Sequence, residues 1–207
     1  MPSLDDGSPP LASPARRRLV AGSILALAGL TLAISRSGAA SGASTVKPPP
    51  TLVAIVGFSN DGKRLKITRV PKIIKSIADW KKLLSAPSFE VTRERGTEQP
   101  FTGKYDDWHG KGVFRCICCD TALFDSAAKF DSGSGWPSFW QPIAQENVLP
   151  REDRRFNQIN TEITCRRCDA HLGHVFDDGP KPTGLRYCIN SVALRFAARA
   201  TALNTAR

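Results

Sequence analysis

Several common sequence patterns are absent from this chain of 207 residues. It has no internal repeat and no heptad pattern, which excludes a solenoid and a long coiled coil. It also has no long run of lysine or arginine, although its net charge is +10 at pH 7. The basic residues are spread along the chain, a pattern that suits anionic surfaces or acidic peptides and does not predict a nucleic-acid partner. The length suits one domain with a substantial core and appendages.

A long uninterrupted apolar run is also missing. The most apolar stretch, Leu19 to Ile34, contains several small and polar residues and is short and mild for a transmembrane helix. It follows three arginines, residues 16–18, and precedes small residues that offer cleavage after Ala40 or Ala43. Residues 1–43 therefore predict an export signal of the twin-arginine type that is cleaved. We expect a protein of the bacterial periplasm without stable membrane association after processing; an inner-membrane anchor is the alternative.

Residues 44–75 form the next section, which we expect to be a proline-rich linker and a small hairpin. Leu52 to Phe58 is apolar and β-branched, and Asn60-Asp61-Gly62 is a turn signal. A helix is expected to follow from Ser76 to Leu84. Ser76 and Asp79 have the spacing of a capping box, and an apolar stripe follows.

The remaining chain changes to short β-like runs separated by Gly, Pro and Asp. We expect one domain over residues 76–197 and a flexible tail over residues 198–207. The clearest strands are expected at Val113 to Ile117, Thr161 to Cys165, Leu172 to Phe176 and Leu185 to Leu194.

Two Cys-x-x-Cys pairs indicate a metal site. Four thiolates suit one Zn²⁺ ion in a closed, structural site, and the ligands are expected to be Cys116, Cys119, Cys165 and Cys168. The gap between the pairs is longer than in a simple zinc ribbon, so the ion is expected to clamp two distant hairpins. Redox pairs or disulfides are the alternative, which export makes possible. Cys118 has the wrong spacing for this site and is expected to be a bystander thiol.

The segment from Gly184 to Ser191 alternates apolar and polar residues and predicts a β-strand. Its polar positions are Arg186, Cys188 and Asn190. A positive charge two residues from a thiol favours the nucleophilic thiolate, and an amide can donate to a developing anion or orient substrate. A buried structural cysteine on an ordinary strand is the alternative interpretation.

Three longer motifs surround the cysteine pairs in order: residues 129–139 (KFDSGSGWPSF), residues 171–176 (HLGHVF) and residues 184–191 (GLRYCINS). With them, the chain from about residue 77 to residue 196 resembles the zinc-binding form of the B-type peptide-methionine (R)-S-oxide reductases. The resemblance implies a mainly β fold of two antiparallel sheets, tent-like, with peripheral short helices and one structural zinc. It also implies reduction of methionine R-sulfoxide in oxidised proteins by an external thiol, from a thioredoxin-like or other dithiol donor.

The resemblance also implies roles for individual residues. Cys188 is the expected nucleophile and becomes a sulfenic acid. His171 and His174 are expected to supply a proton, and Arg186 and Asn190 to assist. The expected substrate-binding residues are Trp136, as a wall against the S-methyl group, Glu162 and Phe139. Because an odd separation in a regular strand would turn the two histidines to opposite faces, we expect a bulge at Leu172-Gly173.

Two positions depart from the family's pattern. Ser134 occupies the place where many members have a resolving cysteine, so the usual internal disulfide cannot form. Asn160 stands where an arginine is common, and an altered substrate affinity is the expected consequence. Two other functions remain open at this point: a non-catalytic zinc module that binds proteins or nucleic acid, and a redox sensor that uses Cys118 with Cys188.

Overall fold

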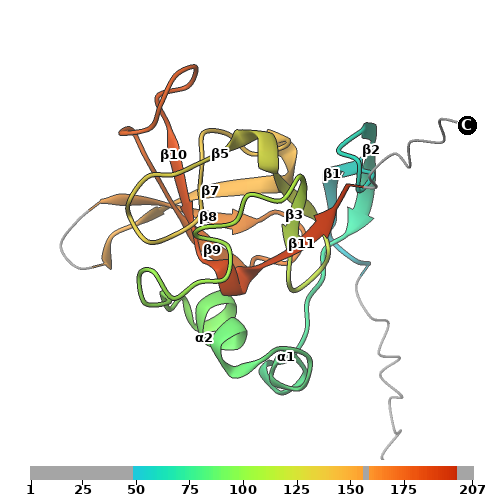
Figure 1. Cartoon of the computed structure of the whole chain (residues 1–207). Helices are drawn as coiled ribbons and strands as arrows, with labels where there is room; N and C mark the ends of the chain where they lie inside the picture. The colour runs from blue at the N-terminus through green and yellow to red at the C-terminus, as the bar shows by residue number, and fades with distance from the viewer. Residues whose placement is uncertain (1–48, 156–158, 200–207) are drawn as a thin grey trace, which may run out of the picture. The chain divides into compact units, whose positions relative to one another are not determined.

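The computed structural model describes residues 49–155 and 159–199 (Figure 1). The expected export signal, residues 1–43, lies outside the described residues. No helix in the described ranges combines the length and the apolar character that crossing a membrane requires.

The described residues form mainly antiparallel β-structure, as expected. The bounds of the strands are β1 Leu52–Phe58, β2 Arg64–Pro71, β3 Gly112–Cys116, β4 Ala122–Asp125, β5 Lys129–Phe130, β6 Ser138–Phe139, β7 Val148–Asp153, β8 Asn160–Cys165, β9 His171–Phe176, β10 Arg186–Ile189 and β11 Leu194–Ala198. The helices are α1 Ile77–Leu83 and α2 Ala86–Glu94, with short 3₁₀ turns at Ser126–Ala128, Gln145–Asn147 and Ser191–Ala193.

Two sheets build the domain that the sequence predicts. Within the described ranges, one sheet has six strands in the order β5-β6-β10-β9-β8-β7, and the other has three in the order β11-β3-β4. Aromatic side chains pack in the core between them: Phe139 and Phe124 stack with ring centroids 4.4 Å apart, and Phe114 meets Phe139 edge-on at 5.1 Å. All three rings are fully buried, so burial of aromatic surface stabilises the association of the sheets.

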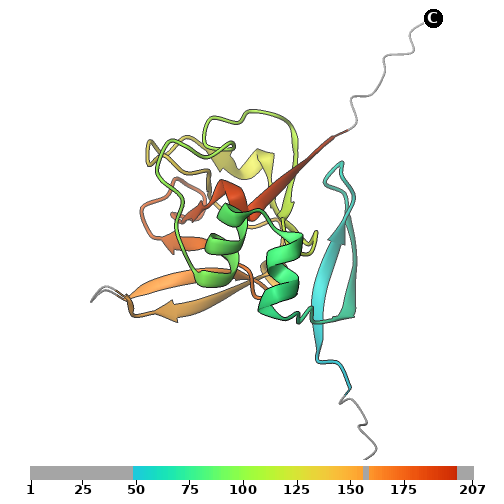
Figure 2. The ribbon, with the colours of Figure 1, turned by 90° about the horizontal axis from the view of Figure 1, so that it is seen from below.

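The expected hairpin is present and forms a separate two-stranded sheet of β1 and β2 (Figure 2). Its inner face packs Val56 and Phe58 against the domain. The buried amide of Asn147 fastens it: Oδ1 accepts from Val56 N (2.8 Å), and Nδ2 donates to Val56 O (2.9 Å) and to Ala122 O (2.8 Å). One side chain therefore pairs with β1 as a neighbouring strand would.

The expected helix from Ser76 to Leu84 is confirmed as α1, with Ser76 and Leu84 as its caps. The Ser76 hydroxyl accepts from Asp79 N (3.1 Å), and Trp80 is the buried residue of the helix. The sequence interpretation missed α2, which directly follows. Ser85 caps α2, and Arg95 ends it in the left-handed conformation at φ 60°. Residue 95 thus lies at a sharp turn after α2.

The expected continuous strand from Leu185 to Leu194 is wrong. The chain leaves the large sheet after Ile189, makes a 3₁₀ turn at Ser191–Ala193, and enters the small sheet as β11. The carboxylate of Glu98 accepts from Ser191 N (2.6 Å) and Val192 N (3.0 Å), which satisfies the free N–H groups at the start of the turn. β11 runs to Ala198, and Arg199 N donates to Lys111 O (3.0 Å). Residues 200–207 of the expected tail lie outside the described residues.

Candidate active site and metal centre

Cys188 lies near the centre of the six-stranded sheet on β10. Its neighbours Tyr187 and Ile189 are buried, whereas Cys188 is partly exposed, as the alternation predicts. Its register partners are Ser138 on β6 and His174 on β9. Because opposed residues of antiparallel strands share a face, a hydroxyl and an imidazole flank the thiol from both sides.

The immediate contacts of the thiol come from a glycine-rich loop. Ser134 Oγ lies 4.0 Å from Cys188 Sγ. Ser134 and Arg186 also line a surface pocket of about 550 Å³ with Ser132 and Asp178. The position that the family resemblance assigns to a resolving cysteine is therefore the position that touches Cys188.

Arg186 favours the Cys188 thiolate, as expected, but its effect is not the largest one on the thiol. Burial raises the pKa of Cys188, and it outweighs the charge of Arg186 and the hydrogen bond from Ser134, which lower that pKa. The guanidinium is also held elsewhere: Nε and a terminal nitrogen donate to Asp178 at 2.8 Å each, and the group lies 4.6 Å from the Phe176 ring centroid. The Asp178 carboxylate therefore neutralises part of the Arg186 charge that acts on the thiol.

The expected bulge on β9 is confirmed. Ile163 pairs with Gly173 and Thr164 with His171, so Leu172 is an extra residue in β9. Gly173 has a φ of 155°. The ring centroids of His171 and His174 lie 5.4 Å apart. The inserted residue therefore brings the two imidazoles together, as the argument from strand parity requires.

Each histidine is held by its own carboxylate. Nδ1 of His171 donates to Glu162 Oε1 (2.7 Å), and Nε2 of His174 donates to Asp153 Oδ2 (3.0 Å). A terminal nitrogen of Arg95 lies 2.7 Å from Glu162 Oε2 and 3.6 Å from Asp153 Oδ2. One guanidinium therefore links both carboxylates. Sequence reasoning missed Arg95 and Asp153, because neither belongs to a motif.

The two histidines differ in their exposure to solvent. The His171 side chain is 1% exposed, and burial lowers its pKa despite the carboxylate of Glu162. The His174 side chain is 21% exposed. Neutral His171 is thus part of the interior, whereas His174 opens toward solvent beside Cys188.

Two residues expected to bind substrate lie in the interior. Phe139 is fully buried and stacks on Phe124, because Ser138 occupies the face of β6 that is turned to Cys188. Glu162 is 3% exposed and uses both oxygens on His171 and Arg95. Both side chains are thus closed to solvent in this structure, and a substrate contact by Phe139 or Glu162 stays a prediction; Glu162 holds a histidine.

Asn190 also departs from its expected place. β10 ends at Ile189, so Asn190 does not continue the polar row of Arg186 and Cys188. It is 3% exposed. Its amide donates to Leu172 O (3.0 Å) and accepts from Glu98 N (3.0 Å). The side chain thereby connects the β9 bulge to the loop that carries Glu98.

Trp136 is the expected aromatic wall and remains partly exposed. Its indole N–H donates to Glu98 O (3.1 Å). This bond fixes the ring beside the loop of Ser134. Glu98 thus contacts Trp136, Asn190 and the 3₁₀ turn. Asn160 begins β8 opposite Asp153, and nothing in the structure explains its departure from the family pattern.

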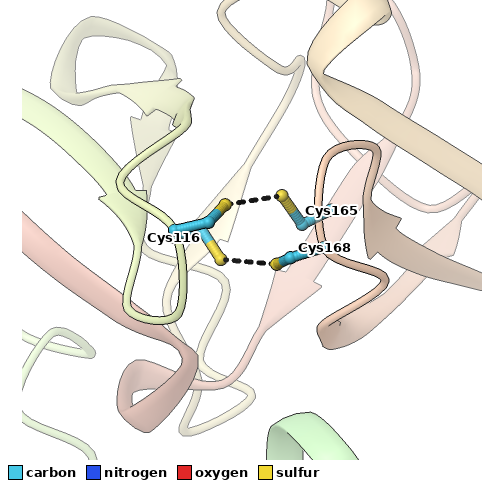
Figure 3. A group of neighbouring side chains, drawn as sticks. Cys116, Cys165 and Cys168 are labelled. Carbon is cyan, nitrogen blue, oxygen red and sulfur yellow. Dashed lines mark hydrogen bonds between the residues drawn. The ribbon is translucent and has the colours of Figure 1, made fainter. Parts of the chain in front are cut away.

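The four cysteines of the two pairs meet between the sheets. Their sulfurs all lie within 4.8 Å of one another, with Cys116 Sγ 3.7 Å from Cys168 Sγ and Cys119 Sγ 3.5 Å from Cys165 Sγ. Thiolates 2.3 Å from a tetrahedral zinc ion are roughly 3.8 Å apart. Figure 3 shows Cys116 facing Cys165 and Cys168 from the opposite turn. The set fits one tetrahedral metal ion.

The two turns share one local design. Asp120 and Asp169, which follow the second cysteine of each pair, have φ values of 64° and 54°. Each of these residues donates its N–H to the carbonyl of the first cysteine at 2.9 Å. The first turn follows β3 of the small sheet and the second follows β8 of the large one. A metal ion here would join the two sheets.

Cys118 stays outside this group of four ligands. Its Sγ contacts Thr92 Oγ1 on α2 at 3.4 Å. The residue is partly buried against the main core. It therefore behaves in the structure as a small packing residue beside α2.

Comparison with known proteins agrees with this site. The model of the SelR domain matches residues 84–198. A protein of Herminiimonas arsenicoxydans named peptide methionine sulfoxide reductase MsrB is 54% identical over 127 residues, which cover 61% of this chain and 93% of that protein. Proteins with the same name from Pseudomonas entomophila and Hahella chejuensis are 56% and 53% identical, over 59% and 60% of this chain and 94% and 90% of their own lengths.

A partly exposed thiol flanked by an imidazole, in a β fold with a four-cysteine site, suits a thiol-dependent oxidoreductase. The matched domain is more specific than this class. The chain belongs to the SelR family, the B-type peptide methionine sulfoxide reductases, and the reaction that this supports is the reduction of methionine sulfoxide.

Proposed function

We propose that this chain reduces the R epimer of methionine sulfoxide in oxidised proteins, with Cys188 as the nucleophile. The observation that carries the proposal is the position of Cys188: a partly exposed thiol between His174 and Ser138, whose contacts Ser134 and Arg186 line a surface pocket.

The reaction begins when the Cys188 thiolate attacks the sulfoxide sulfur. A proton reaches the sulfoxide oxygen, the oxygen moves to Cys188 as a sulfenic acid, and methionine leaves. His174 is the better proton donor of the two histidines because it is partly exposed and lies directly opposite Cys188. Protonated His174 can donate from Nδ1 while Asp153 holds Nε2. His171 and Glu162 keep the β9 bulge and the neighbouring ring in place.

Trp136 supports the choice of epimer. Its indole is fixed by Glu98, so it offers an aromatic wall for the methyl group while His174 addresses the oxygen. With the attack of Cys188 on the sulfur, the wall and the donor fix three directions at this chiral centre, and together they admit one hand of the sulfoxide. Asn190 acts through the bulge and the Glu98 loop as a positioning residue.

An external thiol completes the cycle. Two equivalents of thiol, or one dithiol, reduce the sulfenic acid to the Cys188 thiol and release a disulfide and water. Ser134 cannot form a disulfide, and Cys118 is turned to Thr92 of α2. Dimedone should therefore trap a sulfenic acid on Cys188, and turnover with dithiothreitol should be unchanged by Cys118→Ser. Changing Ser134 to cysteine should supply a resolving thiol at contact distance and yield a disulfide with Cys188.

The four-cysteine site would hold one structural zinc. Cys116, Cys119, Cys165 and Cys168 occupy all four tetrahedral positions, so the ion would stabilise the fold and leave no position for substrate. We also propose that residues 1–43 direct export to the periplasm. Replacing Arg16, Arg17 and Arg18 with lysine should then retain the precursor in the cytoplasm, and normal export of that variant would remove this part of the proposal.

Separated epimers of a methionine sulfoxide peptide test the function. With dithiothreitol, the R epimer should be consumed and the S epimer left, and Cys188→Ser should abolish the reaction. The Cys118→Ser protein is the matched control and should match the unaltered protein. A chain that consumes neither epimer, or a Cys188→Ser protein that still consumes the R epimer, would contradict the proposal.

A further inference from the structure

Three serine hydroxyls form a chain that ends at the Cys188 thiol. Ser138 Oγ donates to Trp136 O (3.2 Å), and Ser132 Oγ lies 2.8 Å from the oxygens of both Ser138 and Ser134. Ser134 Oγ then lies 4.0 Å from Cys188 Sγ. Ser138 is completely buried on β6 opposite Cys188, so it anchors the chain on the rigid sheet.

The direction of each hydrogen bond follows from the number of protons. A hydroxyl has one proton to donate. Ser138 gives its proton to Trp136 O, since a carbonyl can only accept, so the proton between Ser132 and Ser138 comes from Ser132. The proton between Ser134 and Ser132 must then come from Ser134. This arrangement leaves a lone pair of Ser134 for the S–H of Cys188.

Ionisation of Cys188 changes this arrangement at a single link. A thiolate has no proton and can only accept, so Ser134 satisfies it by turning its hydroxyl from Ser132 to Sγ. The bond given up is neutral and the bond gained is charge-assisted, which is the stronger type. After this change, Ser132 Oγ still accepts a hydrogen bond from the backbone N–H of Ser134 (3.4 Å).

We propose that Ser134 is a positioning residue whose hydroxyl reverses its hydrogen bond as Cys188 ionises, and that Ser132 opposes this reversal by holding the Ser134 proton in the thiol state. The proposal deepens the function proposed above, because it assumes that the Cys188 thiolate is the reacting form. In this proposal Ser134, at the resolving position, accepts a hydrogen bond from the Cys188 thiol and donates one to the Cys188 thiolate.

The electrostatics of the thiol agree with this assignment. Burial raises the pKa of Cys188 most, and the charge of Asp178 raises it further. The charge of Arg186, the hydrogen bond from Ser134 and a hydrogen bond from Arg186 lower it. Because burial favours the protonated thiol, a hydroxyl that donates to the sulfur only after ionisation stabilises the thiolate without disturbing the thiol.

The proposal predicts shifts of opposite sign for two neighbouring serines. Ser134→Ala removes the donor to the thiolate and should raise the pKa of Cys188 by about one unit. Ser132→Ala removes the competitor for the Ser134 proton and should lower that pKa by about half a unit. Ser134→Thr keeps the hydroxyl and should restore a pKa close to that of the unaltered protein.

The pH dependence of Cys188 alkylation measures these shifts. The rate of carbamidomethylation by iodoacetamide is followed at Cys188 by peptide mass mapping of the full chain carrying Cys118→Ser. Opposite shifts for Ser134→Ala and Ser132→Ala, with rescue by threonine, support the proposal. Shifts in the same direction, or none, would overturn it, because general loosening of the loop moves both variants alike. The readout needs no turnover, so failure to reduce sulfoxide would count only against the proposed function.

Discussion

Gly173 lies against the backbone of Cys188 so closely that a Cβ on Gly173 would be 2.0 Å from the Cys188 carbonyl oxygen. The same glycine has a φ of 155° next to the inserted Leu172. The bulge that brings the histidines together therefore requires the absence of a side chain at this position.

Replacing Gly173 with alanine should lower the free energy of unfolding by roughly 3 kcal/mol or more, because the methyl group meets immovable backbone. Urea unfolding at neutral pH measures the loss. Gly184→Ala is the matched control: Gly184 has a φ of 71°, and a Cβ added there would have no neighbouring atom within 4 Å, so alanine there should cost only about 1 kcal/mol of conformational strain. Equal losses for the two variants would contradict the steric explanation.

The metal site should depend on cysteines from both turns. Cys165→Ser should lose the zinc ion and lower the free energy of unfolding by roughly 4 kcal/mol or more, because metal-binding energy contributes to folding. Cys118→Ser should keep the ion, since its sulfur contacts Thr92. Metal content per chain and thermal unfolding measure both effects. One zinc ion per chain persisting after combined replacement of Cys116 and Cys165 would refute the assignment.

Asp178 should restrain the reactivity of Cys188. Its carboxylate holds the Arg186 guanidinium, and its negative charge raises the pKa of the thiol. Asp178→Asn should therefore lower the Cys188 pKa by about 0.3 unit, whereas Arg186→Gln should raise it; the Asp178 effect should fade in 1 M salt because that side chain is exposed. Alkylation rates across pH provide the measurement. Asp177→Asn is the neighbouring control and should shift the profile less than Asp178→Asn does.

Asp153 should make the stability of the protein depend on pH. Hydrogen bonds from Arg155, and next from His174, hold the pKa of Asp153 well below its ordinary value. A depressed pKa adds stability above the unfolded-state value of about 3.9, and this stability is lost as the pH falls toward the folded-state pKa. Asp153→Asn should thus cost about 2 kcal/mol at pH 7 and progressively less below about pH 4.

Urea unfolding at several pH values tests this prediction. Glu152→Gln supplies the control, because the neighbouring Glu152 side chain is 53% exposed and its ion pair with Arg154 lies at the surface. A cost for Asp153→Asn that stays constant from pH 7 to pH 3 would show that packing, not ionisation, explains the effect.

The parts of the site that follow from short-range rules could be predicted from the sequence. The spacing within each cysteine pair fixes four ligands, and the odd separation of His171 and His174 requires a bulge whose only flexible residue is Gly173. Alternation placed Cys188 on the accessible side of β10. Each of these predictions depends on residues within a few positions of one another.

The parts that depend on long-range pairing could not be predicted. Arg95 reaches Glu162 from a position 67 residues away in the chain, and no local pattern marks this contact. β7 was not predicted because Pro150 and three charged residues interrupt the alternation of apolar and polar residues. β7 lies at the edge of the sheet, where a strand tolerates such residues. The burial of Phe139 was not predicted because a contiguous motif does not reveal which of its side chains face the core.

The amide of Asn147 sets a practical limit on how this protein can be shortened. The family match begins at residue 84, after the β1–β2 hairpin, and suggests a convenient place to cut. A cut there would remove Val56 and leave the buried Asn147 amide with one of its three bonds, the one to Ala122 O. It would also uncover Val113 and Ala122, which Val56 and Phe58 now cover. The shortened domain would have an Asn147 amide with unsatisfied hydrogen-bonding groups and a newly exposed apolar patch around it. The exposed patch favours aggregation, and the unsatisfied amide lowers stability. Expression trials should therefore start upstream of β1.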